Sequence, residues 1–94
     1  MMLGAISKKP LDRLDYRFDF SRWMPSGDHI TGAEATIAGS TASVFKTDWS
    51  EREVQVWLEG GAAGERGTVT LIITTEAQRV KEVAAGLEIT ENCR

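Results

Sequence analysis

The run from residue 54 to residue 75 constrains the fold of this chain more than any other feature of the sequence. Two short segments in which apolar and polar residues alternate flank a stretch rich in glycine. A period of two places every second side chain on the same face of a β-strand. The run therefore predicts a half-buried antiparallel hairpin over 53–59 and 67–75. The apolar positions are Val54, Val56 and Leu58, followed by Val69, Leu71 and Ile73.

The remaining segments extend the same pattern. Residues 13–20 alternate aromatic and charged side chains, so one face points to a core and the other to water. Residues 30–38 and 41–47 are weaker strands, and residues 79–91 fit helical and strand spacing alike, with strand favoured by Gly86. The predicted core comprises Tyr16, Phe18, Phe20, Val56, Leu58 and Leu71, with Trp23 as a plug at one end or, alternatively, as an exposed anchor.

Six or seven short strands with turns about every ten residues predict an all-β protein, an Ig-like antiparallel β-sandwich. We expect three parts in the 94 residues: an N-terminal arm over 1–12, the sandwich over 13–91 and a short tail over 92–94. Pro10 and the charges around it set the arm apart, and such an arm becomes ordered on a partner.

Composition excludes several function classes. A net charge of −3 with no basic stripe argues against nucleic acid as a partner. No segment has the apolar length of a membrane span, and the first ten residues lack the charge order of a signal peptide. The single His29 and single Cys93 stand far apart in sequence, so we expect no metal, no cofactor and no intramolecular disulfide.

No constellation of residues predicts catalysis. His29 beside Asp28 is expected to be a surface histidine in a turn. The stretch 60–67 shares only its glycine content with a phosphate-binding loop, because no Lys-Ser/Thr pair follows it and Glu65 repels phosphate. Its glycines are expected to supply positive φ in a mobile turn. The chain is therefore predicted not to be an enzyme.

The candidate interface centres on Trp57 and Ile72. Both alternate with inward-pointing residues, so the predicted hairpin brings them together as an apolar patch on its outer face. Cover by the arm or by a loop of the same chain is the alternative. Trp49 is either a flap at the edge of the core or an exposed contact. Further candidate contacts are the turn glycines Gly60, Gly61 and Gly64, and the arm with Lys8 and Lys9. The side chains of the Lys8-Lys9 pair are expected to be solvated.

Four pieces of the sequence, in this order, carry a resemblance to a known family. They are Leu14–Met24, with its alternating aromatics and a tryptophan; Gly27-Asp28-His29-Ile30; Val56-Trp57-Leu58-Glu59-Gly60-Gly61-Ala62-Ala63-Gly64; and Ile73-Thr74-Thr75. Together the chain resembles the phage fibre–tail adaptors, small Ig-like virion proteins of tailed bacteriophages and prophages. It departs from them at Gly67, where an aromatic is usual, and at Gln78-Arg79, where Gly-Arg is common.

The resemblance implies a structural adaptor of a tailed-phage virion. Such a protein is made in the host cytoplasm, is present in the tail in several copies in a symmetric ring, and joins the tail or connector ring to a fibre or another virion protein. It also implies that residues 79–91 are the last strand. The alternative is a soluble Ig-like accessory module that binds carbohydrate or protein.

Overall fold

A computed structural model describes residues 2–90 of the chain. The predicted tail over 92–94, with Cys93, lies outside the described residues. The described part contains seven strands and no helix: β1 (Met2–Lys8), β2 (Leu14–Asp19), β3 (Ile30–Ala38), β4 (Ser43–Trp49), β5 (Glu53–Glu59), β6 (Arg66–Thr75) and β7 (Val80–Ile89). The prediction of an all-β chain is confirmed, and the ambiguous residues near the C-terminus form strand β7.

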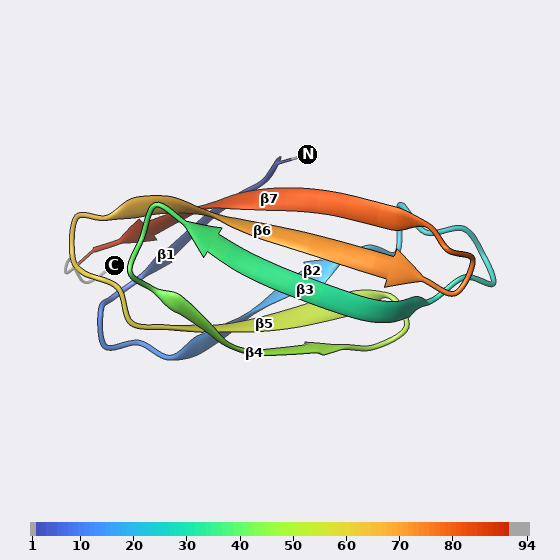
Figure 1. The fold of residues 1–94 in the computed structure, drawn as a ribbon, viewed down its shortest axis with the longest axis horizontal. Helices are drawn as coiled ribbons and strands as arrows, with labels where there is room; N and C mark the ends of the chain where they lie inside the picture. The colour runs from blue at the N-terminus through green and yellow to red at the C-terminus, as the bar shows by residue number, and fades with distance from the viewer. Residues whose placement is uncertain (1, 91–94) are drawn as a thin grey trace.

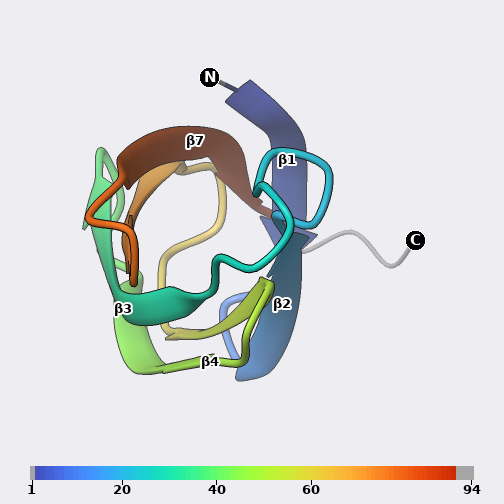
Figure 2. The same ribbon diagram turned by 90° about the vertical axis from the view of Figure 1, so that its right-hand side faces the viewer.

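The strands form two sheets packed face to face as a β-sandwich (Figure 1). One sheet has four strands in the order β1-β7-β6-β3, and the other has three in the order β2-β5-β4. Only the β4–β5 and β6–β7 connections join neighbours within a sheet, and every other connection between described strands crosses from one sheet to the other. The end view in Figure 2 shows the two layers, with β1 beside β7 at one flank.

The core lies between the sheets and is built by the period-two pattern. In β5 and β6, the inward side chains Val54, Val56, Leu58, Leu71 and Ile73 are completely buried. In β7, which lies beside β6 in the same sheet, every second residue from Val83 to Ile89 is also buried. Burying an aliphatic side chain of this size contributes roughly 1.5–3 kcal/mol, so these rows dominate the stability of the fold.

The aromatic residues of β2 and of the segment after it line the rest of the core. Phe18 and Phe20 are buried, while Tyr16 and Trp23 are half-buried and pack against the core. Trp23 lies at the end of the sandwich, with the Lys81 ammonium 5.3 Å from the centre of one of its rings. Leu14 starts the same row but remains 44% exposed, because β2 is an edge strand and Leu14 is its first residue.

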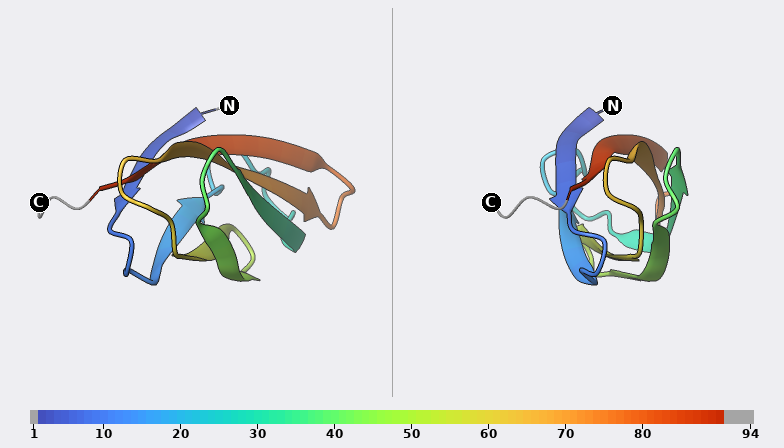
Figure 3. Two further views of the ribbon diagram at one scale, coloured as in Figure 1. Left: turned by 60° about the vertical axis from the view of Figure 1, so that its left-hand side comes forward. Right: turned by 90° about the vertical axis from the view of Figure 1, so that its left-hand side faces the viewer.

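The predicted hairpin is wrong. β5 pairs with β2 and β4, whereas β6 pairs with β3 and β7, so the two strands belong to opposite sheets. The connection over 60–65 runs across the end of the sandwich (Figure 3, right). Alternation shows that one face of each strand is buried, but strands on either side of a shared core have the same alternation.

The structure also differs from the predicted arm. Residues 2–8 form β1, which pairs in parallel with β7 from Met2 opposite Ala84 to Lys8 opposite Ile89. Ile6 faces the core and is buried, while Ser7 is exposed. Pairing with a parallel strand far away in sequence leaves no local pattern. The local pattern around Lys8, Lys9 and Pro10 is that of an irregular polar segment, and it therefore predicts an arm. The rest of the predicted arm belongs to the turn over 9–13, which joins β1 to β2.

Candidate interface surfaces

Trp57 lies on the outer face of the three-stranded sheet. It is directly opposite Asp15 of β2 and Lys46 of β4, and its neighbours along β5 point into the core. The side chain is half-buried rather than freely exposed, and its indole Nε1 is covered, with no hydrogen-bond partner among the described residues. Trp57 is therefore a partly covered apolar residue within a polar face.

Ion pairs and hydrogen bonds cross the outer face around Trp57. Glu59 Oε1 is 2.9 Å from Arg13 Nη2, and the Arg13 guanidinium also lies 4.4 Å from the centre of the Phe45 ring. Lys46 pairs with Asp48 at 3.1 Å on β4. Most charges on this face thus have a partner in the same face: Arg13–Glu59, Arg17–Glu53 and Lys46–Asp48 as ion pairs, and Gln55 donating to Asp15.

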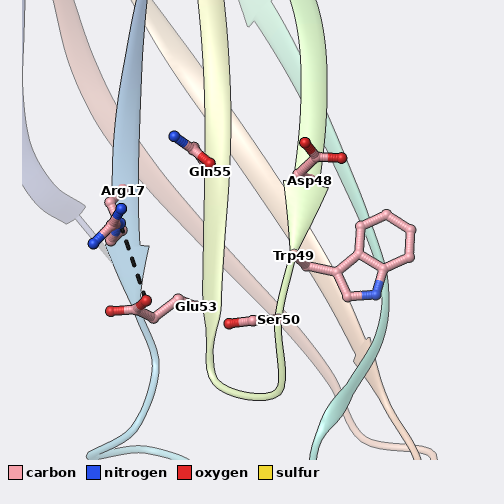
Figure 4. Close-up of a pocket in the computed structure, with 6 residues that line it drawn as sticks. All are labelled: Arg17, Asp48, Trp49, Ser50, Glu53 and Gln55. Atoms are coloured by element: carbon pink, nitrogen blue, oxygen red, sulfur yellow. Dashed lines mark ion pairs between the residues drawn. The ribbon is translucent and has the colours of Figure 1, made fainter.

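A shallow hollow lies on the same face, close to the β4–β5 turn. Figure 4 shows Arg17 and Glu53 on one side of it, with Arg17 Nε 4.0 Å from Glu53 Oε1, and Trp49 at the end of β4 on the other. Trp49 is on the edge strand opposite the inward-pointing Val54 and is 45% exposed, so it lies at the edge of the core and is also accessible to solvent. The lining is Arg17, Asp48, Trp49, Ser50, Glu53 and Gln55.

Ile72 lies on the opposite side of the molecule from Trp57. It is 40% exposed on the outer face of the four-stranded sheet, between Glu34 of β3 and Glu82 of β7. The expected joint patch of Trp57 and Ile72 does not form, because their strands belong to different sheets. Each residue is instead the centre of a separate face.

The glycine-rich connection over 60–65 is held in place by Glu65. Glu65 Oε1 accepts hydrogen bonds from the backbone N–H groups of Ala62 at 2.9 Å and Thr41 at 3.1 Å, and from the Ser40 hydroxyl at 2.9 Å. These bonds, that from Ala62 first, lower the pKa of Glu65 from 4.5 to about 2. The connection is thereby tied to the β3–β4 turn, whereas the sequence suggested a mobile loop.

The glycines of this connection have the expected backbone role. Gly60, Gly61 and Gly64 all have positive φ. At Gly61 a Cβ atom would also lie 2.9 Å from Ile89 Cδ1, so a side chain there conflicts with the core as well as with the backbone conformation. Gly60 and Gly64 are exposed and Gly61 is half-buried. The glycines therefore allow the backbone conformation of this connection, and its backbone lies at the surface.

Lys8 is not solvated. It is only 2% exposed, and its Nζ donates to the carbonyl oxygens of Gly60 at 2.5 Å and Lys9 at 2.6 Å. Burial lowers the pKa of Lys8, and Asp12 acts in the opposite direction. Alternation along β1 places Lys8 on the core side after Ile6. Lys8 therefore joins β1 to the glycine-rich connection and is not accessible to a partner, while Lys9 is half-buried in the next turn.

The turn between β1 and β2 presents an apolar residue that the sequence patterns did not single out. Asp12 N–H donates to Lys9 O at 3.1 Å, and Asp12 Oδ2 accepts from Lys9 N–H, also at 3.1 Å. Pro10 occupies the second position of this turn, where its fixed φ is favourable. Leu11, the third residue, is 99% exposed. The turn thus holds one leucine out from the surface at the end of the sandwich.

A buried carboxylate fixes the opposite end of the molecule. Asp28 Oδ1 accepts from the backbone N–H groups of His29 and Ala77, and Asp28 Oδ2 lies 3.0 Å from Arg79 Nη1. Burial alone would raise the pKa of Asp28, but these bonds and one from the Thr75 hydroxyl outweigh it, so the pKa is lowered. Asp28 thereby joins the turn after β2 to the β6–β7 turn. The sequence pattern around Asp28 and its neighbour His29 does not predict this role.

Nothing in residues 2–90 forms a cluster of three or more His, Cys, Asp or Glu side chains able to hold a metal ion. The same residues contain no helix long and apolar enough to cross a membrane.

Comparison with known proteins identifies one matching family. The family model described as "Podophage GP4 fiber-tail adaptor protein gp77" matches residues 8–88. No curated protein matches the chain. The match begins at the last residue of β1 and ends one residue before the end of β7, so it covers nearly the whole sandwich.

Proposed function

The chain belongs to the podophage GP4 fiber-tail adaptor family, and from this membership we propose that it is a non-enzymatic structural adaptor in a phage tail. In this role it joins the tail or connector ring to a fibre or to a neighbouring virion protein. It is made in the host cytoplasm and is incorporated into the particle in several copies arranged as a symmetric ring. The match over residues 8–88 is the observation that carries the proposal.

The shape of the molecule supports such a role. An adaptor needs two separate surfaces, because it contacts two different neighbours at once. The sandwich offers two outer faces, one centred on Trp57 and the other on Ile72, with a rigid core between them. The exposed Leu11 at one end adds a third apolar contact. Fixed turns at both ends, held by Glu65 and Asp28, keep these surfaces in a constant relation.

Peptide mass spectrometry on purified particles tests this proposal. The protein should be present at a small fixed number per particle relative to the major capsid protein, on the order of one ring of subunits. Tail preparations separated from capsids should retain it. Absence from clean particles would overturn the proposal and favour a free carbohydrate- or protein-binding module.

A further inference from the structure

The two outer faces of the sandwich differ in how their charges are satisfied. On the three-stranded sheet the acids around Trp57 have partners within the face, as Arg13–Glu59 and Lys46–Asp48 illustrate. On the four-stranded sheet Glu34 and Glu82 are exposed, and neither has an ion-pair partner or side-chain hydrogen bond among residues 2–90. On the three-stranded sheet these acids are paired with cations or, for Asp15, hydrogen-bonded to Gln55, whereas Glu34 and Glu82 on the four-stranded sheet carry unpaired negative charge.

The free carboxylates occupy defined positions. Glu34 and Glu82 both lie directly opposite Ile72, one on each neighbouring strand, so the three residues form a row across β3, β6 and β7. Adjacent strands are about 4.8 Å apart, which places the two glutamates roughly 10 Å from each other with the isoleucine between them. An exposed apolar side chain is thus flanked symmetrically by unpaired acids.

The positions next to this row are uncharged, and the ion pair of Arg66 and Glu88, at 3.2 Å, lies at one end of the face. Towards one end of the face, the outward positions after Ile72 are threonine, alanine and glycine: Thr36, Thr68, Thr70, Ala84 and Gly86. Towards the other end Thr74 lies opposite Val80, which is 67% exposed. Protein interfaces have centres depleted of charge with polar and charged residues at the rim, and this face has that distribution.

We propose that the outer face of β3, β6 and β7 docks a protein surface that has an apolar centre flanked by two basic side chains. The partner's basic groups would be about 10 Å apart, matching Glu34 and Glu82 across Ile72. Complementary charge at the rim fixes register and excludes acidic partners, while the small central side chains allow close approach. The inference rests on the adaptor function proposed above. It identifies the outer face of the four-stranded sheet as one of the adaptor's two contact faces.

The first test uses charge reversal in assembling particles. Glu34→Lys with Glu82→Lys is compared with Glu51→Lys with Glu76→Lys, which makes the same change of net charge at exposed turn positions outside both outer faces. We expect the first pair to reduce incorporation about tenfold or more, because like charges would then meet at the interface, and the control pair to remain within about twofold of wild type. Circular dichroism and thermal melting establish that both fold; if the lysine pair does not, Glu34→Gln with Glu82→Gln replaces it.

The second test identifies the neighbour. A photo-crosslinking amino acid is placed at Ile72, and at Gln55 on the other outer face as the control, and crosslinked peptides from particles are sequenced by mass spectrometry. A link from position 72 to another virion protein, next to Lys or Arg residues and absent from position 55, supports the proposal. A link from position 72 to a second copy of this chain, no link at all, or normal incorporation of the Glu34 and Glu82 variants would overturn it. If any of these results is obtained while the wild-type protein is present in particles, the docking face is wrong but the adaptor function still holds. If the wild-type protein is absent from particles, both proposals are wrong.

Discussion

At the scale of single residues, two carboxylates determine the shape of the loops. Glu65 and Asp28 each accept several hydrogen bonds from a connection that is distant in sequence, and both have lowered pKa values. A carboxylate that accepts hydrogen bonds from backbone N–H groups is stabilised in its charged form. The ends of the sandwich are therefore held by charge-assisted hydrogen bonds, and the sheets by apolar burial.

Replacing Glu65 with Gln should make the stability of the fold less dependent on pH in the acidic range. The folded-state pKa of Glu65 is about 2, below its ordinary value of 4.5. A lowered pKa contributes stability that is fully present above pH 4.5 and is lost as the pH falls towards 2. We therefore expect the melting temperature of Glu65→Gln to lie below wild type at pH 7 and the difference to shrink between pH 4.5 and 2. Glu76→Gln, at an exposed turn position, is the control. An equal difference at every pH would contradict the role given to ionised Glu65.

Neighbouring residues of β6 should respond very differently to truncation. Leu71 is completely buried and Ile72 is 40% exposed. Leu71→Ala should lower the free energy of unfolding by about 2–5 kcal/mol, because it leaves a cavity in the core. Ile72→Ala, the matched control, should lower it by less than about 1 kcal/mol. Chemical denaturation measures both; similar losses would contradict the difference in burial, and a larger loss for Ile72→Ala would mean that the inward and outward positions of β6 are exchanged.

At the scale of elements, β1 is the strand with the least local support. Among residues 2–90 its only strand neighbour is β7, which pairs with it in parallel although the two strands are at opposite ends of the sequence. Parallel pairing needs a long connection, and here the connection is the rest of the domain. Its attachment depends on Ile6 in the core, on Lys8 under the glycine-rich connection, and on the hydrogen bond of 2.9 Å from Thr90 N–H to Lys8 O.

A charge on the inward face of β1 should therefore separate it from the sheet. Ile6→Asp places a carboxylate in the core and is expected to lower the free energy of unfolding by at least about 2 kcal/mol. Amide hydrogen exchange should become faster in β1 and along β7. Ser7→Lys, which places a charge on the exposed outward face opposite Glu88, should leave exchange unchanged. Rapid exchange in wild-type β1 would show instead that the strand is not docked in solution.

At the scale of the whole molecule, the sandwich separates two outer faces that point in opposite directions. Trp57 belongs to the sheet β2-β5-β4, and Ile72 belongs to the sheet β1-β7-β6-β3. An adaptor with one neighbour on each face should lose these neighbours independently. The distance between the faces makes direct coupling of substitutions at the two positions small.

Truncation of Trp57 is the whole-molecule test of this arrangement. We expect Trp57→Ala to leave the fold intact and to weaken incorporation into particles, because the indole is half-buried on the outer face and outside the core. Contacts made through Ile72 should persist and remain detectable by crosslinking. Gln55→Ala, on the same strand and face, is the matched control. Unfolding of Trp57→Ala would show that the indole is structural, and full incorporation would show that this side chain makes no contact that assembly requires.

Alternation in the sequence determined which side chains are buried in most strands. Val56, Leu58 and Leu71 are inward because period-two patterning is a local property of an extended chain. The glycines at 60, 61 and 64 were likewise readable, because positive φ strongly favours glycine. The same local information produced the resemblance to the adaptor family, which the match over residues 8–88 confirms.

Only the tertiary structure decided which strands pair and which surfaces result. Two strands with the same alternation look identical in sequence whether they are neighbours in one sheet or opposed across a core. The sequence therefore predicts that Trp57 and Ile72 lie together, although they lie on opposite faces. The sequence predicts a solvated Lys8 because its acceptor, the carbonyl of Gly60, is 52 residues away. Pairings and hydrogen bonds between distant segments depend on the packing of the whole chain, and no local pattern records them.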